Sequence, residues 1–166
     1  WLYVDLKPEN IYLFGDQEYR IGDLGFVAMD SLKYASLPDR CIGAYTAPEV
    51  LDAYSDVNAT VDIYAAGLVL YQVYNGGVLP FEGRAGSEVL PPPEYADYEM
   101  AEIILKACDP DPKERWQDPV QMGQAIVSYM QKNGVYDLFD EVGSVDDYGL
   151  SKSGTELFFK VAERIG

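Results

Sequence analysis

Two short blocks of the sequence carry residue types that suit phosphoryl transfer. Residues 5–10 (DLKPEN) place a carboxylate, an ammonium and an amide close together, and a second carboxylate, Asp23, lies in the sequence GDLG further on. Magnesium-assisted phosphoryl transfer needs a carboxylate to orient the attacking hydroxyl and further oxygen ligands to hold the metal. We therefore expect Asp5 to orient and deprotonate a hydroxyl. Asn10 and Asp23 would hold Mg²⁺, and Lys7 would offset charge on the transferred group.

Three further blocks follow in a recognisable order. Ala47 to Glu49 (APE) comes first, Asp62 to Gly67 (DIYAAG) opens an apolar stretch, and Arg115 stands further on. Together with the two blocks above, this order resembles the large lobe of a eukaryotic-type Ser/Thr protein kinase, over residues 1–132. One block alone would be weak evidence, whereas several blocks in the right order at plausible spacings are specific.

The resemblance implies a mainly α fold, the C-terminal lobe of a protein kinase, in which short β strands carry the catalytic and metal-binding loops. It implies transfer of the γ-phosphoryl group of ATP to a Ser or Thr hydroxyl of a protein substrate, with Mg²⁺ as the second cofactor. The spacing of Asp5 and Lys7 is that of the Ser/Thr type rather than the tyrosine type. By resemblance, Asp5 is the catalytic aspartate and Lys7 contacts phosphate. Asn10 and Asp23 are the implied metal ligands of the nucleotide site.

Three matched residues have structural roles in the family. The resemblance implies a buried ion pair between Glu49 and Arg115, which ties the end of the activation segment to the helical part. Removing one partner of such a pair leaves a buried charge without compensation. Asp62 is expected to hydrogen-bond the backbone of the Asp5 loop from a central helix, since a charge in so apolar a helix needs a partner.

Some positions depart from the family pattern. Val4 stands where the family has an arginine that pairs with a phosphorylated activation loop, and Tyr3 replaces the preceding histidine. Ile42 stands where a threonine bridges the catalytic aspartate and lysine. Tyr12 falls where a small aliphatic side chain supports the adenine, so its bulk either reshapes the nucleotide floor or points elsewhere. Leu24 replaces the usual phenylalanine and keeps an apolar anchor.

The sequence also contains no glycine-rich loop and no nucleotide-binding strand lysine. In the family these belong to the small N-terminal lobe, which we expect to precede Trp1 in a longer protein, bacterial by its sequence style. The chain alone is therefore expected to be inactive. Two alternatives stay open. Val4, Ile42 and Tyr12 favour a pseudokinase-like scaffold or nucleotide-sensing module, whereas the APE block argues against a small-molecule kinase.

Composition excludes other classes of function. The chain has 12 basic and 28 acidic residues, a formal net charge of −16, which argues against nucleic acid or an anionic membrane surface as a partner. This balance is typical of an acidic cytoplasmic protein and also suits steering of basic substrates. Two cysteines and no histidine exclude zinc fingers and Ser-His-Asp triads. No apolar run reaches the length of a membrane span.

Short strands and three helices are expected to position the site. Thr60 is the expected N-cap of a helix that is apolar on every face and must therefore be buried. Asp118 followed by Pro119 predicts the start of the last of the three helices, and Asn75-Gly76-Gly77 predicts the end of the first. The expected strands are 2–4, 11–13 and 19–22, with a turn at 14–18, and the expected helices are 61–74, 98–107 and 119–131.

Two long stretches read as irregular, and the end of the chain changes in character. Residues 26–46 are expected to form a mobile segment, and the Pro- and Gly-rich residues 79–97 a loop. Residues 133–166 are expected to be an acidic linker followed by a short amphipathic helix. Ser153 to Glu156 matches a capping box at the start of that helix. Because an isolated helix of this length is marginal, we expect it to dock on the lobe.

Overall fold

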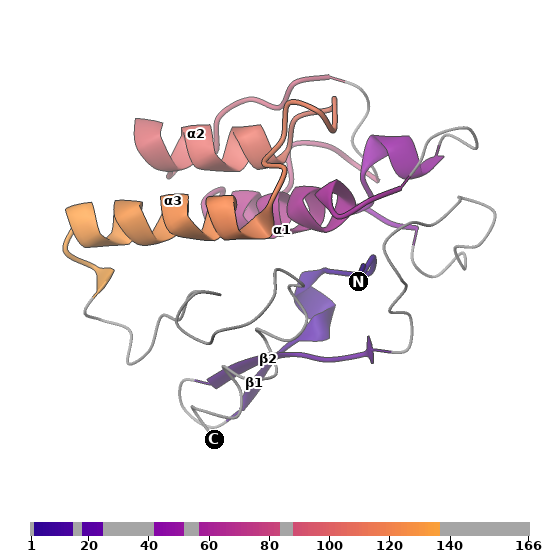
Figure 1. Ribbon diagram of the computed structural model, residues 1–166, viewed down its shortest axis with the longest axis horizontal. Coiled ribbons are helices and arrows are strands. Elements are labelled where there is room, and N and C mark those ends of the chain that lie inside the picture. Colours follow the sequence, from indigo (N-terminus) through magenta and orange to yellow (C-terminus); the bar gives the residue numbers. More distant parts are fainter. Residues whose placement is uncertain (1, 15–17, 25–41, 52–56, 84–87, 137–166) are drawn as a thin grey trace.

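Helices dominate the architecture, and one small hairpin accompanies them. The computed structural model describes residues 2–14, 18–24, 42–51, 57–83 and 88–136. In these ranges the chain forms three α-helices, two short 3-10 helices and one two-stranded hairpin. The α-helices pack together, and the hairpin lies to one side of them (Figure 1). The predicted fold class, mainly α with short strands, is confirmed.

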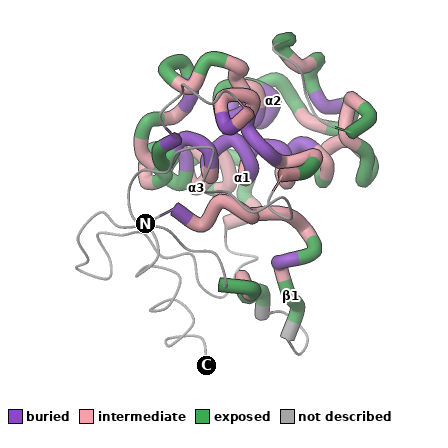
Figure 2. The backbone as a smooth tube through the Cα atoms, turned by 90° about the vertical axis from the view of Figure 1, so that its right-hand side faces the viewer, coloured by how far each residue is buried: buried purple, intermediate pink, exposed green. Residues whose placement is uncertain are grey.

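Helix α1 (Thr60–Val73) is the buried centre of the helical part. Buried positions concentrate along it (Figure 2). Tyr64, Leu68 and Tyr71 are almost completely buried, whereas Val73 at the far end is exposed. A helix that is apolar on every face has no side suited to water, so the sequence pattern accounts for this central position.

The predicted N-cap of α1 is wrong. Ala59 is the cap residue, and its side chain makes no capping hydrogen bond. Instead, the Thr60 backbone N–H donates to Asn58 Oδ1 at 2.9 Å. Asn and Thr are both good capping residues, and Asn58 comes first along the chain, so Thr60 becomes the first helical residue. The Thr60 hydroxyl is then buried without a hydrogen-bond partner among the described residues.

Helices α2 (Tyr98–Ala107) and α3 (Pro119–Lys132) begin where the sequence predicts. The Asp97 carboxylate accepts a hydrogen bond at 2.9 Å from a backbone N–H in the first turn of α2. Asp118 does the same at 2.9 Å for α3, with proline at the first helical position. These caps satisfy N–H groups that have no partner inside the helix, which fixes both starting points.

The three helices share an apolar interior and approach closely at one glycine. Ile63 of α1, Ala107 of α2 and Met122 of α3 form one buried cluster. At Gly67 a Cβ would lie 2.7 Å from both Ala107 Cβ and Cys108 Sγ. A larger residue at position 67 would therefore force α1 and α2 apart.

The hairpin joins the two chemistry-bearing blocks. Strands β1 (Ile11–Phe14) and β2 (Glu18–Ile21) pair antiparallel, close to two of the three predicted strand positions. The third prediction, a strand at 2–4, is wrong, because only Leu2 makes a strand-like bridge there. The pairing continues past the strand ends, because the Gly22 backbone N–H donates to the Asn10 carbonyl at 2.9 Å. The hairpin therefore brings Asn10 and the residue before Asp23 together, although they are far apart in sequence.

Other predictions fall partly or wholly outside the described residues. The irregular segment is described only from residue 42 onward. Of the predicted linker and helix at 133–166, only residues 133–136 are described. The predicted loop at 79–97 has neither helix nor strand at its described positions. Gly76 and Gly77 end α1 with φ of 66° and 85°, which suits glycine. The described helices include none with the length and apolar character needed to cross a membrane.

Candidate active site

A short loop ahead of β1 brings together the three polar residues of the first block. Lys7 Nζ lies 2.7 Å and 2.9 Å from the two carboxylate oxygens of Asp5. Asn10 Nδ2 donates to the Asp5 carbonyl at 2.7 Å and to Asp5 Oδ2 at 3.1 Å. Pro8 starts a single 3-10 turn (Pro8–Asn10) that folds the loop back so that these contacts form. The Asp5 carboxylate is thus held from two sides with part of its surface open.

Asp62 of α1 holds the start of this loop. Its two carboxylate oxygens accept hydrogen bonds from the backbone N–H groups of Tyr3 and Val4, each at 2.7 Å. Burial raises the pKa of the Asp62 carboxyl, and these two hydrogen bonds partly oppose that rise. The central helix therefore fixes the backbone immediately before Asp5.

Val4 adopts a backbone conformation that its side chain disfavours. Its φ is 70°, in the left-handed region, where a β-branched residue is rare. Such a conformation costs on the order of 1–3 kcal/mol and persists only where surrounding contacts enforce it. The hydrogen bond from Val4 N–H to Asp62 is one such contact. The position expected to hold an arginine therefore holds a strained valine.

Asp23 lies on the other side of the loop and is exposed, with a φ of 53°. Its links to the Asp5 loop run through the backbone of Gly22, which donates to the Asn10 carbonyl and accepts a hydrogen bond from the Tyr3 hydroxyl. Burial, with the nearby carboxylates of Asp5 and Asp23, raises the pKa of Tyr3 to about 12. Tyr3 therefore stays protonated and keeps donating at neutral pH.

The predicted metal ligands are oxygen ligands of the kind that Mg²⁺ prefers. Because Asn10 Nδ2 faces Asp5, a cation would be bound by the amide oxygen of Asn10 and by the Asp23 carboxylate. Among the described residues, no group of three or more His, Cys, Asp or Glu side chains is arranged to hold a metal ion. Two protein ligands still suit Mg²⁺, which keeps several waters and binds substrate phosphates.

A cavity of about 370 Å³ opens beside Asp5 and Lys7. Its opposite wall is the segment 43–46, which the sequence did not indicate as part of the site. The Tyr45 hydroxyl of this wall donates to Gln72 of α1, so the wall is fixed to the central helix. Tyr45, just ahead of the APE block, could have indicated this wall. Its partner Gln72 lies 27 positions away, however, so the sequence alone does not reveal the contact.

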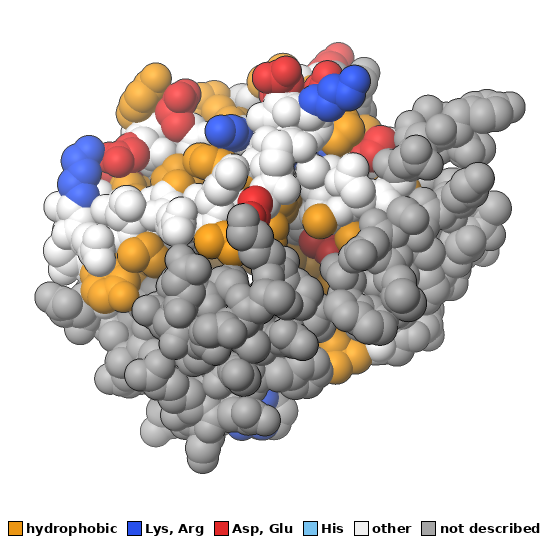
Figure 3. Space-filling view, viewed as in Figure 1, with side chains coloured by type: hydrophobic (Ala, Val, Ile, Leu, Met, Phe, Trp, Pro, Cys, Tyr) orange, Lys and Arg blue, Asp and Glu red, His pale blue; other side chains and the backbone are white. Residues whose placement is uncertain are grey.

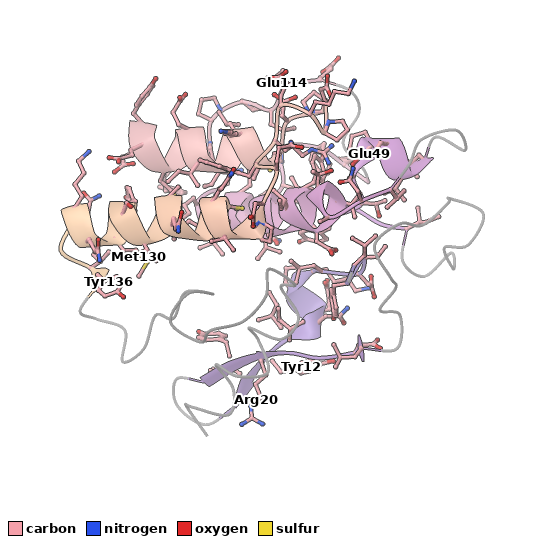
Figure 4. All side chains as sticks on the ribbon, viewed as in Figure 1. Tyr12, Arg20, Glu49, Glu114, Met130 and Tyr136 are labelled. Carbon is pink, nitrogen blue, oxygen red and sulfur yellow. The ribbon has the colours of Figure 1, made fainter. Side chains whose placement is uncertain are left out.

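Glu49 and Arg115 are brought together in the helical part. Arg115 Nη1 and Nη2 lie 2.7 Å and 2.8 Å from the two Glu49 carboxylate oxygens, a bidentate pair. The Arg115 side chain is fully buried and also donates to the carbonyls of Asp109 and Thr60. Its guanidinium lies over the Tyr64 ring, 4.6 Å from the centroid. Figure 4 places Glu49 on the turn beside the start of α1.

Comparison with known proteins agrees with this geometry. The model of the family described as "Protein kinase domain" matches residues 1–132. The chain belongs to the protein kinase family. The matched residues include the Asp5 loop, the hairpin and the three described α-helices.

Individual relatives are named as protein kinases from plants and an amoeba, and two of the three below are named as serine/threonine-protein kinases. The chain is 32% identical over 126 residues to "CBL-interacting protein kinase 26" of Oryza sativa subsp. japonica, covering 69% of this chain and 25% of the relative. It is 31% identical over 121 residues to "Probable serine/threonine-protein kinase MARK-C" of Dictyostelium discoideum, covering 67% of this chain and 15% of the relative. A match to "CBL-interacting serine/threonine-protein kinase 26" of Arabidopsis thaliana reaches 28% over 165 residues, with 92% and 37% covered. The chain thus spans well under half the length of these kinases.

Proposed function

We propose that the full-length protein is a Ser/Thr protein kinase and that this chain supplies its large lobe. It would transfer the γ-phosphoryl group of ATP to a Ser or Thr hydroxyl of a protein substrate. The observation that carries the proposal is the Asp5 carboxylate, held 2.7 Å from Lys7 at the edge of an open cavity. Similarity to named serine/threonine-protein kinases supports the same reaction class.

Each polar residue of the site has a distinct part in this proposal. Asp5 orients the substrate hydroxyl in the cavity and accepts its proton, while Lys7 offsets charge on the phosphoryl group. Asn10 and Asp23 hold Mg²⁺, which neutralises the nucleotide phosphates when bound. The segment 43–46 forms the wall against which a protein substrate would lie. Positioning and charge stabilisation are most of what phosphoryl transfer requires from a protein.

Further proposals concern the rest of the protein, its binding partners and its cellular location. We propose a small lobe of the same protein as the partner that completes the nucleotide site. Residues 133–166 would form an acidic linker and a short amphipathic helix beyond the large lobe. Nucleic acid is not a proposed partner, since the described Lys and Arg side chains on the face in Figure 3 lie singly among acidic and apolar ones. The cytoplasmic location and the bacterial source stay predictions from the sequence.

A pseudokinase-like scaffold or nucleotide sensor is the second candidate. Val4 and Ile42 favour it because each replaces a side chain that works at the site in the family, and the Tyr12 ring packs against Gly22. Assay of the full-length protein with γ-labelled ATP and Ser/Thr peptides separates the two. The kinase proposal predicts labelled phosphoserine or phosphothreonine that disappears when EDTA removes Mg²⁺. Nucleotide binding without any transfer would instead establish the scaffold.

The 166-residue chain alone is expected to be silent. Its sequence supplies metal ligands but contains no glycine-rich loop to cover the nucleotide. Titration of ATP with Mg²⁺ into the chain by calorimetry should give no binding at micromolar concentrations, and no autophosphorylation should appear. Micromolar binding would show that the large lobe is sufficient for nucleotide capture and would sink this prediction.

Activation by loop phosphorylation is expected to be unnecessary. A phosphate orders a loop by pairing with arginine, and Val4 occupies the position where that arginine is expected. Phosphatase treatment of the full-length enzyme should therefore lower its activity by much less than about tenfold, which is about 1.4 kcal/mol in the barrier. Mass spectrometry would verify that phosphate has been removed.

Four hydroxyl side chains of the loop, those of Ser31, Tyr34, Ser36 and Thr46, could in principle accept phosphate. Ser31, Tyr34 and Ser36 lie outside the described residues, but Thr46 is buried and its Oγ1 accepts a hydrogen bond from Gly43 N–H at 2.7 Å. Thr46 is therefore a poor phosphate acceptor. The variant Val4→Arg should make activity more sensitive to dephosphorylation. A strong dependence already present in the wild-type enzyme would contradict the prediction.

A further inference from the structure

The Tyr12 ring lies directly over Gly22, in the space that a side chain at position 22 would occupy. A Cβ placed on Gly22 would lie 2.5 Å from Tyr12 Cε2 and 2.8 Å from Cδ2. Such distances are shorter than any ordinary carbon contact. The φ of Gly22 is not positive, so its backbone does not demand glycine. A side chain at position 22 would therefore force the Tyr12 ring to move.

The hairpin register explains how the two residues meet. Tyr12 lies opposite Arg20 in the antiparallel pairing, and Gly22 follows Arg20 by two positions on the same face of the strand. Figure 4 shows Tyr12 and Arg20 on the hairpin. Side chains on one face reach diagonal neighbours across an antiparallel pair, and an aromatic ring commonly covers a cross-strand glycine in this way. The ring thus replaces the missing side chain of Gly22.

Gly22 is also the point on which the placement of Asp23 depends. Its N–H donates to the Asn10 carbonyl at 2.9 Å, and its carbonyl accepts from the Tyr3 hydroxyl. The next residue, Asp23, adopts a φ of 53°, which non-glycine residues seldom adopt. Glycine loses more conformational freedom on folding than any other residue, so an uncovered glycine here would loosen Asp23.

We propose that Tyr12 and Gly22 are a matched pair that holds the Asp23 turn, and that Tyr12 is a positioning residue for Asp23. The ring limits the motion of Gly22 and shields its hydrogen bond to Asn10 from water. Tyr12, for which the sequence left open a reshaped nucleotide floor or an orientation elsewhere, would thus be part of the support for the metal site. The role in metal binding rests on the proposed kinase function, whereas the pairing itself does not.

Hydrogen exchange on the 166-residue chain tests the pairing without any need for activity. In Gly22→Ala the new methyl group collides with the ring, and in Tyr12→Ala the glycine loses its cover, so the backbone amide at position 22 should exchange about tenfold faster in each. In the double variant the methyl group has no ring to collide with, so the exchange rate should be no faster than in Tyr12→Ala alone and well below the sum of the two single effects. Tyr19→Ala, which changes an exposed tyrosine of the same hairpin, is the matched control and should change nothing. Additive effects in the double variant, or a wild-type rate in Gly22→Ala, would overturn the pairing.

Magnesium titration of the full-length enzyme tests the positioning role. Each single variant should raise the Mg²⁺ concentration for half-maximal rate by about tenfold, and the double variant should raise it no further than Tyr12→Ala does alone. If the singles keep the wild-type Mg²⁺ dependence while wild-type enzyme is active, Tyr12 does not position Asp23. If the wild-type enzyme transfers no phosphate, the proposed function fails. The hydrogen-exchange experiment still shows whether Tyr12 and Gly22 are coupled.

Discussion

Replacing Asp5 with Asn in the full-length protein is expected to lower phosphoryl transfer by about 10²–10⁴-fold while the fold stays intact. The amide has nearly the shape of the carboxylate and can still accept a hydrogen bond from Lys7, which now lies 2.7 Å away. It cannot take up the proton of the attacking hydroxyl. The rate of labelled phosphate transfer from γ-labelled ATP, together with a thermal melt of the same sample, measures both parts of the prediction.

Two further variants decide what a loss at Asp5 means. Glu102→Gln removes an exposed carboxylate from α2, far from the loop in sequence, and should leave the rate unchanged. Asp23→Ala should remove most of the transfer by a different route, because it acts on the metal, so its residual rate should depend more steeply on Mg²⁺. Near wild-type turnover in Asp5→Asn would show that Asp5 has been given the wrong role.

Arg115→Ala is expected to destabilise the protein by about 3–5 kcal/mol, and activity should fall with the folded population. The variant leaves the Glu49 carboxylate buried without its bidentate partner and leaves the carbonyls of Asp109 and Thr60 without a donor. Single domains are stable by only about 5–15 kcal/mol, so a loss of this size removes a large part of the total. Urea unfolding followed by circular dichroism measures the change.

Two control variants test whether the guanidinium geometry and the burial of the Arg115–Glu49 pair account for this loss of stability. Arg115→Lys keeps the charge but not the planar fork that reaches both Glu49 oxygens, so it should recover only part of the stability. Lys132→Ala breaks an exposed ion pair with Glu99 and should barely move the unfolding curve. An Arg115→Ala protein that melts like wild type and works at full rate would refute the structural role.

The sequence was a good guide wherever local chemistry decided the structure. The start of α3 follows from Asp118, whose carboxylate caps the first turn as expected, and the structure shows Asp97 capping α2 in the same way. The start of α1 was harder to predict, because Asn58 and Thr60 are both capping residues and only one can act. The burial of α1 followed from its apolar faces, since such a pattern leaves no side for water.

Long-range features of the site were less predictable. The contact of Tyr12 with Gly22 depends on the strand register, which the sequence does not specify residue by residue. The hydrogen bond between Tyr45 and Gln72 joins two uncharged residues 27 positions apart, so no charge pattern in the sequence predicts it. The pairing of Glu49 with Arg115 was expected only through the family resemblance. Physical reasoning on single residues would have left both as unrelated charges.

Because α1 and α2 approach closely at Gly67, the Cys108 thiol beside it can report when the two helices separate. Burial raises the pKa of its thiol to about 12, so almost no reactive thiolate exists in the closed protein at neutral pH. The sulfur also packs against the backbone of α1 where a Cβ would come within 2.7 Å of it. An alkylating reagent can therefore reach Cys108 only when the two helices separate. Its labelling rate, in a protein whose Cys41 has been replaced by serine, would measure how often the helical core opens.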